Sequence, residues 1–154
     1  MNEMRIAVDI QAPPDRVWEV IRDAERWPEW TASVDSVRLL RGGPLEVGRR
    51  ALVRQPKLPP AVWRVTELDD GARFFTWVNR GPGMLLTASH GVEPDGAGSR
   101  ATLSLRFSGL LGPLLFRLTR ALSERYIAME AQGLKARSEG ALPTSRKRTS
   151  GSLR

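Results

Sequence analysis

The chain opens with a regular alternation of apolar and polar residues over positions 4–10. Met4, Ile6, Val8 and Ile10 would point to one side of an extended segment, and the residues between them to the other. This period of two predicts a β-strand with one buried face.

A helical spacing replaces this alternation after the proline pair at 13–14, which suits the first turn of a helix. The spacing predicts a helix over 14–23, and a short second helical turn follows over 25–30. The apolar positions of the first helix are Val17, Trp18, Val20 and Ile21.

The middle of the chain returns to short strand-like segments separated by turn-forming residues. Sequences such as Asp69-Asp70-Gly71 favour tight turns between strands. The stretch 56–60 contains too many prolines for a strand interior and is interpreted as a loop or bulge. Six strands are predicted, over 34–40, 49–55, 62–68, 73–79, 84–93 and 100–107.

The period changes again after Gly109, where a long amphipathic helix is predicted over 111–137. Most charged residues of this segment, including Glu130, are expected outside its apolar stripe. The predicted stripe consists of Leu111, Leu114, Leu115, Leu118, Leu122, Tyr126 and Met129.

This order of elements predicts an α+β fold with a curved antiparallel sheet of six to seven strands. Such a sheet must bury one face, and the carboxy-terminal helix is the one segment long and apolar enough to cover it. A curved sheet wrapped around a long helix leaves a space between them, which is the natural ligand site of this architecture.

Several of these segments resemble the START-like (SRPBCC) helix-grip superfamily, in its polyketide cyclase/dehydrase and lipid-transport branch. The resemblance covers roughly residues 4–137 and implies a Bet v 1-like fold with two short helices after the first strand. It also implies binding of lipids, hormones or polyketides, with cyclase activity in some members. The segments that carry it are Ala12-Pro13-Pro14-Asp15-Arg16-Val17-Trp18, Asp23–Trp30, Gly43–Gly48, Val62–Leu68, Phe75-Thr76-Trp77 and Gly98–Leu103.

The amino-acid composition excludes several kinds of metal and disulfide site. The 154 residues contain no cysteine and one histidine, which excludes disulfides, thiolate metal sites and two-histidine zinc sites. We therefore expect no metal and no cofactor. No apolar run is long enough to span a bilayer and the amino terminus does not resemble a signal peptide, so a cytoplasmic protein is expected, either a monomer or a homodimer.

The net charge of +7 is unevenly distributed along the chain. Most of the excess lies after position 135, in a segment rich in Ser, Thr and Gly. The sequence therefore predicts a helix-grip domain over 1–138 and a disordered basic tail over 139–154, with no specific nucleic-acid partner. Lysine is rare among the basic residues, a bias that we interpret as bacterial coding preference.

Candidate ligand-binding residues lie on the faces expected to meet inside the fold. Three roles are compatible with the position of His90: its imidazole packs in the core, contacts a ligand or acts as a general base. Each other candidate could instead pack in the core, bond to a nearby loop or lie on the surface. The candidates are Gln55, Trp63, Phe75, Trp77, His90, Leu118, Leu122 and Arg125.

Three functions remain open from the sequence. The first is binding of a small hydrophobic molecule, lipid-like, aromatic or polyketide-like, in the space under the last helix. The second is a polyketide cyclase or dehydratase in which His90 or Arg125 polarises a carbonyl. The third is an interaction module that acts through the basic tail.

Overall fold

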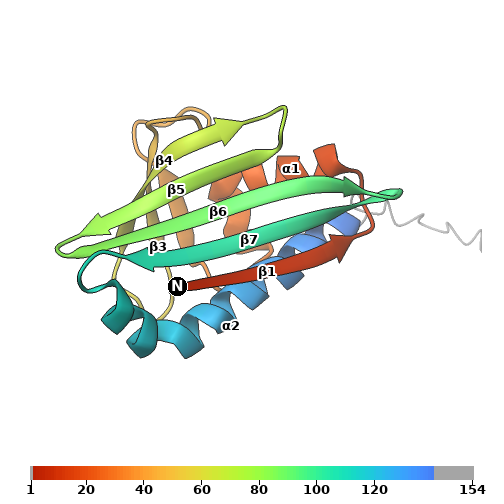
Figure 1. Ribbon diagram of the computed structural model, residues 1–154. Coiled ribbons are helices and arrows are strands. Elements are labelled where there is room, and N and C mark those ends of the chain that lie inside the picture. The colour runs from red at the N-terminus through yellow and green to blue at the C-terminus, as the bar shows by residue number, and fades with distance from the viewer. Residues whose placement is uncertain (1, 141–154) are drawn as a thin grey trace, which may run out of the picture.

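A computed structural model describes residues 2–140 and confirms the α+β helix-grip arrangement (Figure 1). Seven antiparallel strands form one sheet in the order β1-β7-β6-β5-β4-β3-β2. The strands are β1 (Glu3–Ile10), β2 (Ser36–Leu39), β3 (Arg50–Arg54), β4 (Ala61–Asp69), β5 (Phe74–Gly81), β6 (Met84–Asp95) and β7 (Gly98–Ser108). The helices are α1 (Pro14–Arg22), the 3₁₀-helix η1 (Ala24–Glu29) and α2 (Gly112–Glu139).

Strands β2 to β7 are neighbours in the sheet in the order of the chain. Strand β1 pairs with the last of them, β7, and forms the other edge of the sheet. Met4 lies opposite Leu105 and Ile10 lies opposite Ser99, so the first strand is held along most of its length. The ladder between β4 and β5 shifts register between Val65 and Glu67. A bulge of this kind increases the local twist and bends the sheet.

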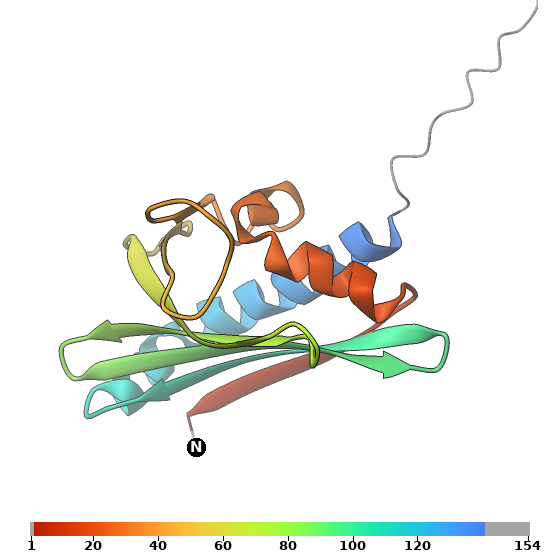
Figure 2. The same cartoon turned by 90° about the horizontal axis from the view of Figure 1, so that it is seen from above.

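The helices all lie on one side of this sheet (Figure 2). Helix α2 packs mainly against β1 and β7 and makes few contacts with β6, while α1 crosses β6 and β7. The part of the sheet formed by β3, β4 and β5 therefore has no long helix packed directly on it. Because the helices cover only part of the sheet, a space remains between α2 and these strands.

Two hydrophobic clusters flank that space. One joins α1 and η1 to the central strands and contains Trp18, Trp27, Trp63, Phe75 and Trp77. The other joins α2 to the β1–β7 edge and contains Met4, Leu103, Phe107, Ile127 and Ala131. The two clusters share Val8, Leu86 and Leu105, which pack against both.

The carboxy-terminal half of α2 fixes how the whole helix is rotated. Ala131 and Leu134 are fully buried, and a Cβ added at Gly133 would lie 2.0 Å from the Trp30 carbonyl oxygen. Such a close approach is possible only for glycine. A helix is rigid over this length, so this contact also sets which residues of its first half point inward.

The predicted apolar stripe of α2 is therefore wrong in its first half. Leu111, Leu114 and Leu118 are exposed, and Leu118 has 74% of its surface accessible. The inward line instead runs from Leu115 toward Ile127, through the polar positions between them. At about 100° per residue, it lies roughly a quarter turn from the predicted stripe.

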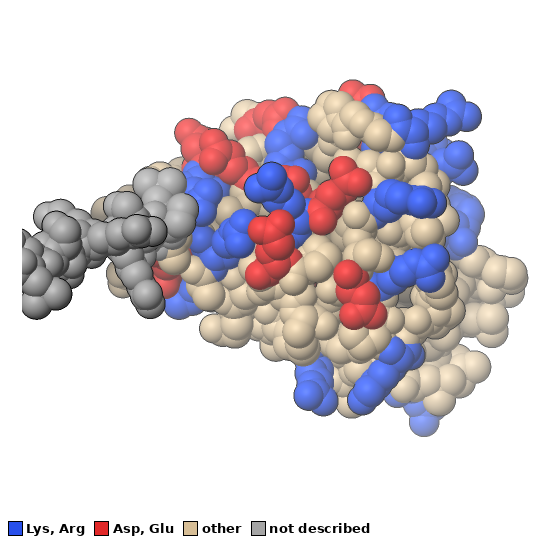
Figure 3. Space-filling view, turned by 180° about the vertical axis from the view of Figure 1, so that it is seen from behind, with Lys and Arg blue, Asp and Glu red and all other residues tan. Residues whose placement is uncertain are grey.

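Ion pairs connect the helices to the rest of the fold on the surface. Arg22 forms a two-point contact with Asp70 at 2.6 and 3.1 Å, and Trp18 Nε1 donates to the same carboxylate at 2.9 Å. The hydrogen bonds from Arg22 and then from Trp18 lower the pKa of Asp70. Acidic and basic side chains are interspersed over the middle of the face seen from behind (Figure 3).

Helix α2 continues to Glu139, which accepts a hydrogen bond from the Gln11 backbone N–H at 2.8 Å. Glu139 is therefore part of the folded domain. The remainder of the predicted basic tail, from 141 onward, lies outside the described residues. Within residues 2–140, no helix has both the length and the apolar character needed to cross a membrane.

Candidate functional site

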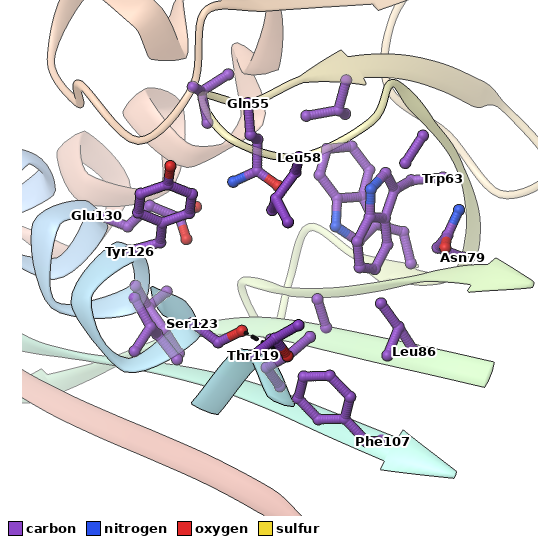
Figure 4. A pocket seen from close by; sticks show the side chains of 18 of the residues that line it. Gln55, Leu58, Trp63, Asn79, Leu86, Phe107, Thr119, Ser123, Tyr126 and Glu130 are labelled. Atoms are coloured by element: carbon purple, nitrogen blue, oxygen red, sulfur yellow. Dashed lines mark hydrogen bonds between the residues drawn. The ribbon is translucent and has the colours of Figure 1, made fainter. Parts of the chain in front are cut away.

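A cavity of about 340 Å³ lies between the two hydrophobic clusters. Its wall draws residues from η1, from strands β3 to β7, from the loop between β3 and β4, and from α2. Tyr126 and Glu130 project from α2 on one side, and Trp63 and Asn79 lie on the opposite side (Figure 4). The cavity is thus built where the sheet curves away from the long helix.

The wall is predominantly apolar. Its aromatic part includes Phe107 and three tryptophans, of which Trp77 lies 5.2 Å from Trp27 and 5.8 Å from Trp63 between ring centroids. Its aliphatic part is lined by Val34, Val53, Leu58, Met84, Leu86, Leu103, Leu105, Leu115 and Ile127.

Several polar groups on the wall already have partners within the protein. Asn79 Nδ2 donates to the Val62 carbonyl at 2.8 Å, and Thr119 Oγ1 donates to the Leu115 carbonyl at 2.7 Å. Gln55 Nε2 donates to the Ser33 carbonyl at 3.1 Å, and the Tyr126 hydroxyl donates to the Pro56 carbonyl. These hydroxyl and amide groups can face an apolar space because the protein satisfies their donors.

His90 stands apart from these satisfied groups. Its ring stacks on Phe75, with centroids 4.4 Å apart and planes 6° from parallel, and it is 5% exposed. Its Nδ1 atom has no hydrogen-bond partner among the described residues. Burial lowers the pKa of His90 to about 3, so the imidazole is neutral at physiological pH.

Glu130 is the second exception. It lies one turn after Tyr126 on α2, and it forms no hydrogen bond or ion pair with another described residue. Burial raises the pKa of Glu130 to about 7, because an apolar wall disfavours the charged carboxylate. The site therefore combines a neutral imidazole with a carboxyl group that is partly ionised near neutral pH.

The structure brings four of the sequence-predicted residues to the cavity wall: Gln55, Trp63, Trp77 and His90. Phe75 lies behind this wall with no exposed surface, covered by Trp18 and Trp27 as well as by His90. It can support His90 but cannot contact a ligand in the cavity.

Leu118, Leu122 and Arg125 do not line the cavity. Leu118 and Arg125 are exposed, and Leu122 is half-buried beside the inward face. Their displacement follows from the rotation of α2 that its carboxy-terminal half imposes. Arg125 is thus not placed to polarise a carbonyl in this cavity.

The sequence prediction missed Glu130, which it placed outside the apolar stripe. The spacing of Ile127, Ala131, Leu134 and Ser138, all buried, could have located it. Extending that line backward along the helix brings Glu130, Ser123 and Thr119 to the same side. The run of leucines in the first half concealed this weaker signal.

No group of three or more His, Cys, Asp or Glu side chains in residues 2–140 is arranged to hold a metal ion. His90 and Glu130 are on the same wall but are not hydrogen-bonded to each other. The chemistry that this arrangement offers is apolar contact together with two unpartnered polar groups.

Comparison with known proteins agrees with this architecture. Residues 1–139 match the family described as polyketide cyclase / dehydrase and lipid transport. The chain therefore belongs to this family. A search among curated proteins found no match.

Solved structures share the fold at low sequence identity. A Thermobifida fusca protein solved by NMR has a TM-score of 0.74 and 22% identity, with 90% of this chain and 93% of that chain covered. Ara h 8.0201 has a TM-score of 0.71 and 11% identity, with 90% and 98% covered.

The di-domain ARO/CYC protein BexL, from the BE-7585A biosynthetic pathway, has a TM-score of 0.68 and 20% identity. The match covers 90% of this chain and 47% of BexL. At these identities the similarity concerns the fold and does not transfer a substrate.

Proposed function

We propose that this protein binds a small, largely apolar molecule in the cavity between the sheet and α2. The observation that carries the proposal is the apolar lining of an open space of about 340 Å³ inside an otherwise well-packed domain. Close packing is the usual condition of a protein interior, so an open space of this size needs a reason. Its volume lies within the range of small-molecule sites.

The satisfied polar groups on the wall support binding as the function. Asn79, Thr119 and Tyr126 direct their donors to backbone carbonyls, so they do not compete with an apolar ligand. Burial of apolar ligand surface contributes about 25 cal/mol per Å². Most of the binding free energy would therefore come from shape and contact area.

A cyclase that uses His90 or Arg125 has weaker support from the same wall. A general base is most effective when its pKa lies near the working pH. Burial holds the pKa of His90 near 3, and no carboxylate orients the ring. Arg125, the other candidate for polarising a carbonyl, is exposed and outside the cavity.

A fluorescence titration with N-phenyl-1-naphthylamine, an uncharged apolar probe, tests the proposal. We expect one probe to bind per chain, with enhanced probe emission and quenched tryptophan emission, because Trp27, Trp63 and Trp77 line the cavity. Urea-unfolded protein serves as the control and should give no enhancement. Absence of binding to the folded protein, or binding of several probes with no saturation, would refute the proposal.

A further inference from the structure

The cavity wall carries a single acidic side chain and no basic one. Among its lining residues in the described part of the chain, Glu130 has the only carboxyl group, and neither lysine nor arginine is present. Glu130 is half-buried, and a carboxylate shielded from bulk water without a partner is unfavourable, so native proteins usually pair such a group. The described residues that line the cavity offer no such pair for Glu130.

The polar groups drawn beside Glu130 in Figure 4 carry no charge that could balance its carboxylate. Tyr126 and Glu130 project from α2, and Gln55 lies across from them (Figure 4). Because Tyr126 donates its hydroxyl proton to Pro56, the hydroxyl oxygen is left as an acceptor. Gln55 donates one Nε2 hydrogen to Ser33, which leaves its second Nε2 hydrogen as a donor and its amide oxygen as an acceptor, both uncharged.

Resting on the proposed function, we propose that the ligand of this cavity is an apolar amine, whose ammonium group pairs with the Glu130 carboxylate. An ammonium group supplies donors and a positive charge, which complement the Glu130 carboxylate and the acceptor oxygen of Tyr126. A ligand carboxylate would meet Glu130 as a like charge. The same cavity therefore discriminates against fatty-acid-like anions.

No other titratable group on the cavity wall supplies a positive charge that could balance the Glu130 carboxylate. His90 of β6 is neutral, because burial lowers its pKa to about 3. Tyr126 of α2 is the remaining titratable side chain on the wall, and β3, β4, β5 and β7 contribute none. The charge of Glu130 thus remains for a ligand to balance.

The inference also predicts a pH dependence. Burial raises the pKa of Glu130 to about 7, so more of this carboxyl group is ionised as the pH rises through neutrality. Amine affinity should increase from pH 6 to pH 8, a range in which an alkylamine stays protonated. The affinity of an uncharged ligand should stay constant over the same range.

Isothermal titration calorimetry with three ligands of matched shape tests the inference: 1-naphthylmethylamine, 1-naphthalenemethanol and 1-naphthoic acid. At pH 8 the amine should bind roughly tenfold to a hundredfold more tightly than the alcohol, the range of a charge-assisted hydrogen bond. The acid should bind most weakly.

Glu130→Gln keeps the shape of the side chain and removes its charge. This variant should bind amine and alcohol with similar affinity, and its amine affinity should not depend on pH. Glu124→Gln is the matched control, because Glu124 is an exposed glutamate of the same helix that pairs with Arg120. It should behave like the wild type.

The possible results separate this inference from the proposed function. Equal affinities for amine and alcohol in the wild type, or an amine preference that survives Glu130→Gln, would overturn the amine inference. The alcohol and the uncharged naphthylamine probe would still bind in both cases, and the proposed function would stand. If none of these molecules binds, both fail together.

Discussion

His90 and Glu130 give the domain opposite dependences on pH at the scale of single residues. The folded-state pKa of His90 is about 3, below its usual 6.5, so the unfolded chain binds a proton first as the pH falls. The folded-state pKa of Glu130 is about 7, above its usual 4.5, so the folded chain holds a proton longer as the pH rises. Stability is therefore lost through His90 as the pH falls from about 6.5 toward 3, and through Glu130 as the pH rises from about 4.5 through 7.

Replacing His90 by phenylalanine should remove the acid-side loss. The stability that depends on neutral His90 is complete above about pH 6.5 and is lost progressively as the pH falls toward 3. Between pH 7 and pH 4 the wild type should lose about 3 kcal/mol more than His90→Phe. Urea unfolding at the two pH values measures the difference. Parallel losses in both proteins would show that His90 is solvated or paired in the folded state.

The long helix α2 decides the site at the scale of elements. Its carboxy-terminal half packs through Ala131, Leu134 and the Gly133 contact with Trp30, and this packing rotates Glu130 into the cavity. The leucines of its amino-terminal half then remain outside. The packing of the carboxy-terminal half of α2 thus determines its rotation, although the amino-terminal half contains more leucines.

Gly133→Ala tests this account of the helix. In an exposed helix, alanine in place of glycine stabilises by roughly 0.5–1 kcal/mol. Here the new Cβ would lie 2.0 Å from the Trp30 carbonyl oxygen, so the variant should instead be destabilised by more than about 2 kcal/mol in urea unfolding.

Ala121→Gly, at an exposed position of α2, provides the comparison. It should lose only the ordinary helix propensity of about 1 kcal/mol. If Gly133→Ala were more stable than the wild type, the contact with Trp30 would not fix the rotation of α2.

The sequence was sufficient to predict the architecture of the whole molecule. Alternation such as that of Met4 to Ile10 and the turn at Asp69-Asp70-Gly71 located the strands within a few residues, because a half-buried strand must alternate. The antiparallel sheet and its single long helix followed from the order of the elements.

The site was predicted only in part. Gln55, Trp63, Trp77 and His90 were assigned to the cavity wall by alternation along their strands, which tertiary packing does not change. The inward face of α2 depends instead on a close contact between residues 103 positions apart, Trp30 and Gly133. The helical pattern offers two competing inward lines, and the leucine run of the first half outweighed the weaker line that leads to Glu130.

The central claim is that a ligand occupies the cavity beside α2, and a pair of tryptophan substitutions tests it most directly. Leu115 lines the cavity, whereas Leu118 lies on the same helix with 74% of its surface exposed. Leu115→Trp should fill the space, at a cost of roughly 1–3 kcal/mol in stability, and Leu118→Trp should leave it open.

The measurement is the dissociation constant of N-phenyl-1-naphthylamine for the wild type and both variants, with circular dichroism confirming that each is folded. The account predicts that Leu115→Trp loses probe binding and that Leu118→Trp keeps the wild-type affinity. Unchanged binding in folded Leu115→Trp, or loss of binding in Leu118→Trp alone, would contradict it and place the apolar site on the outer surface of the helix.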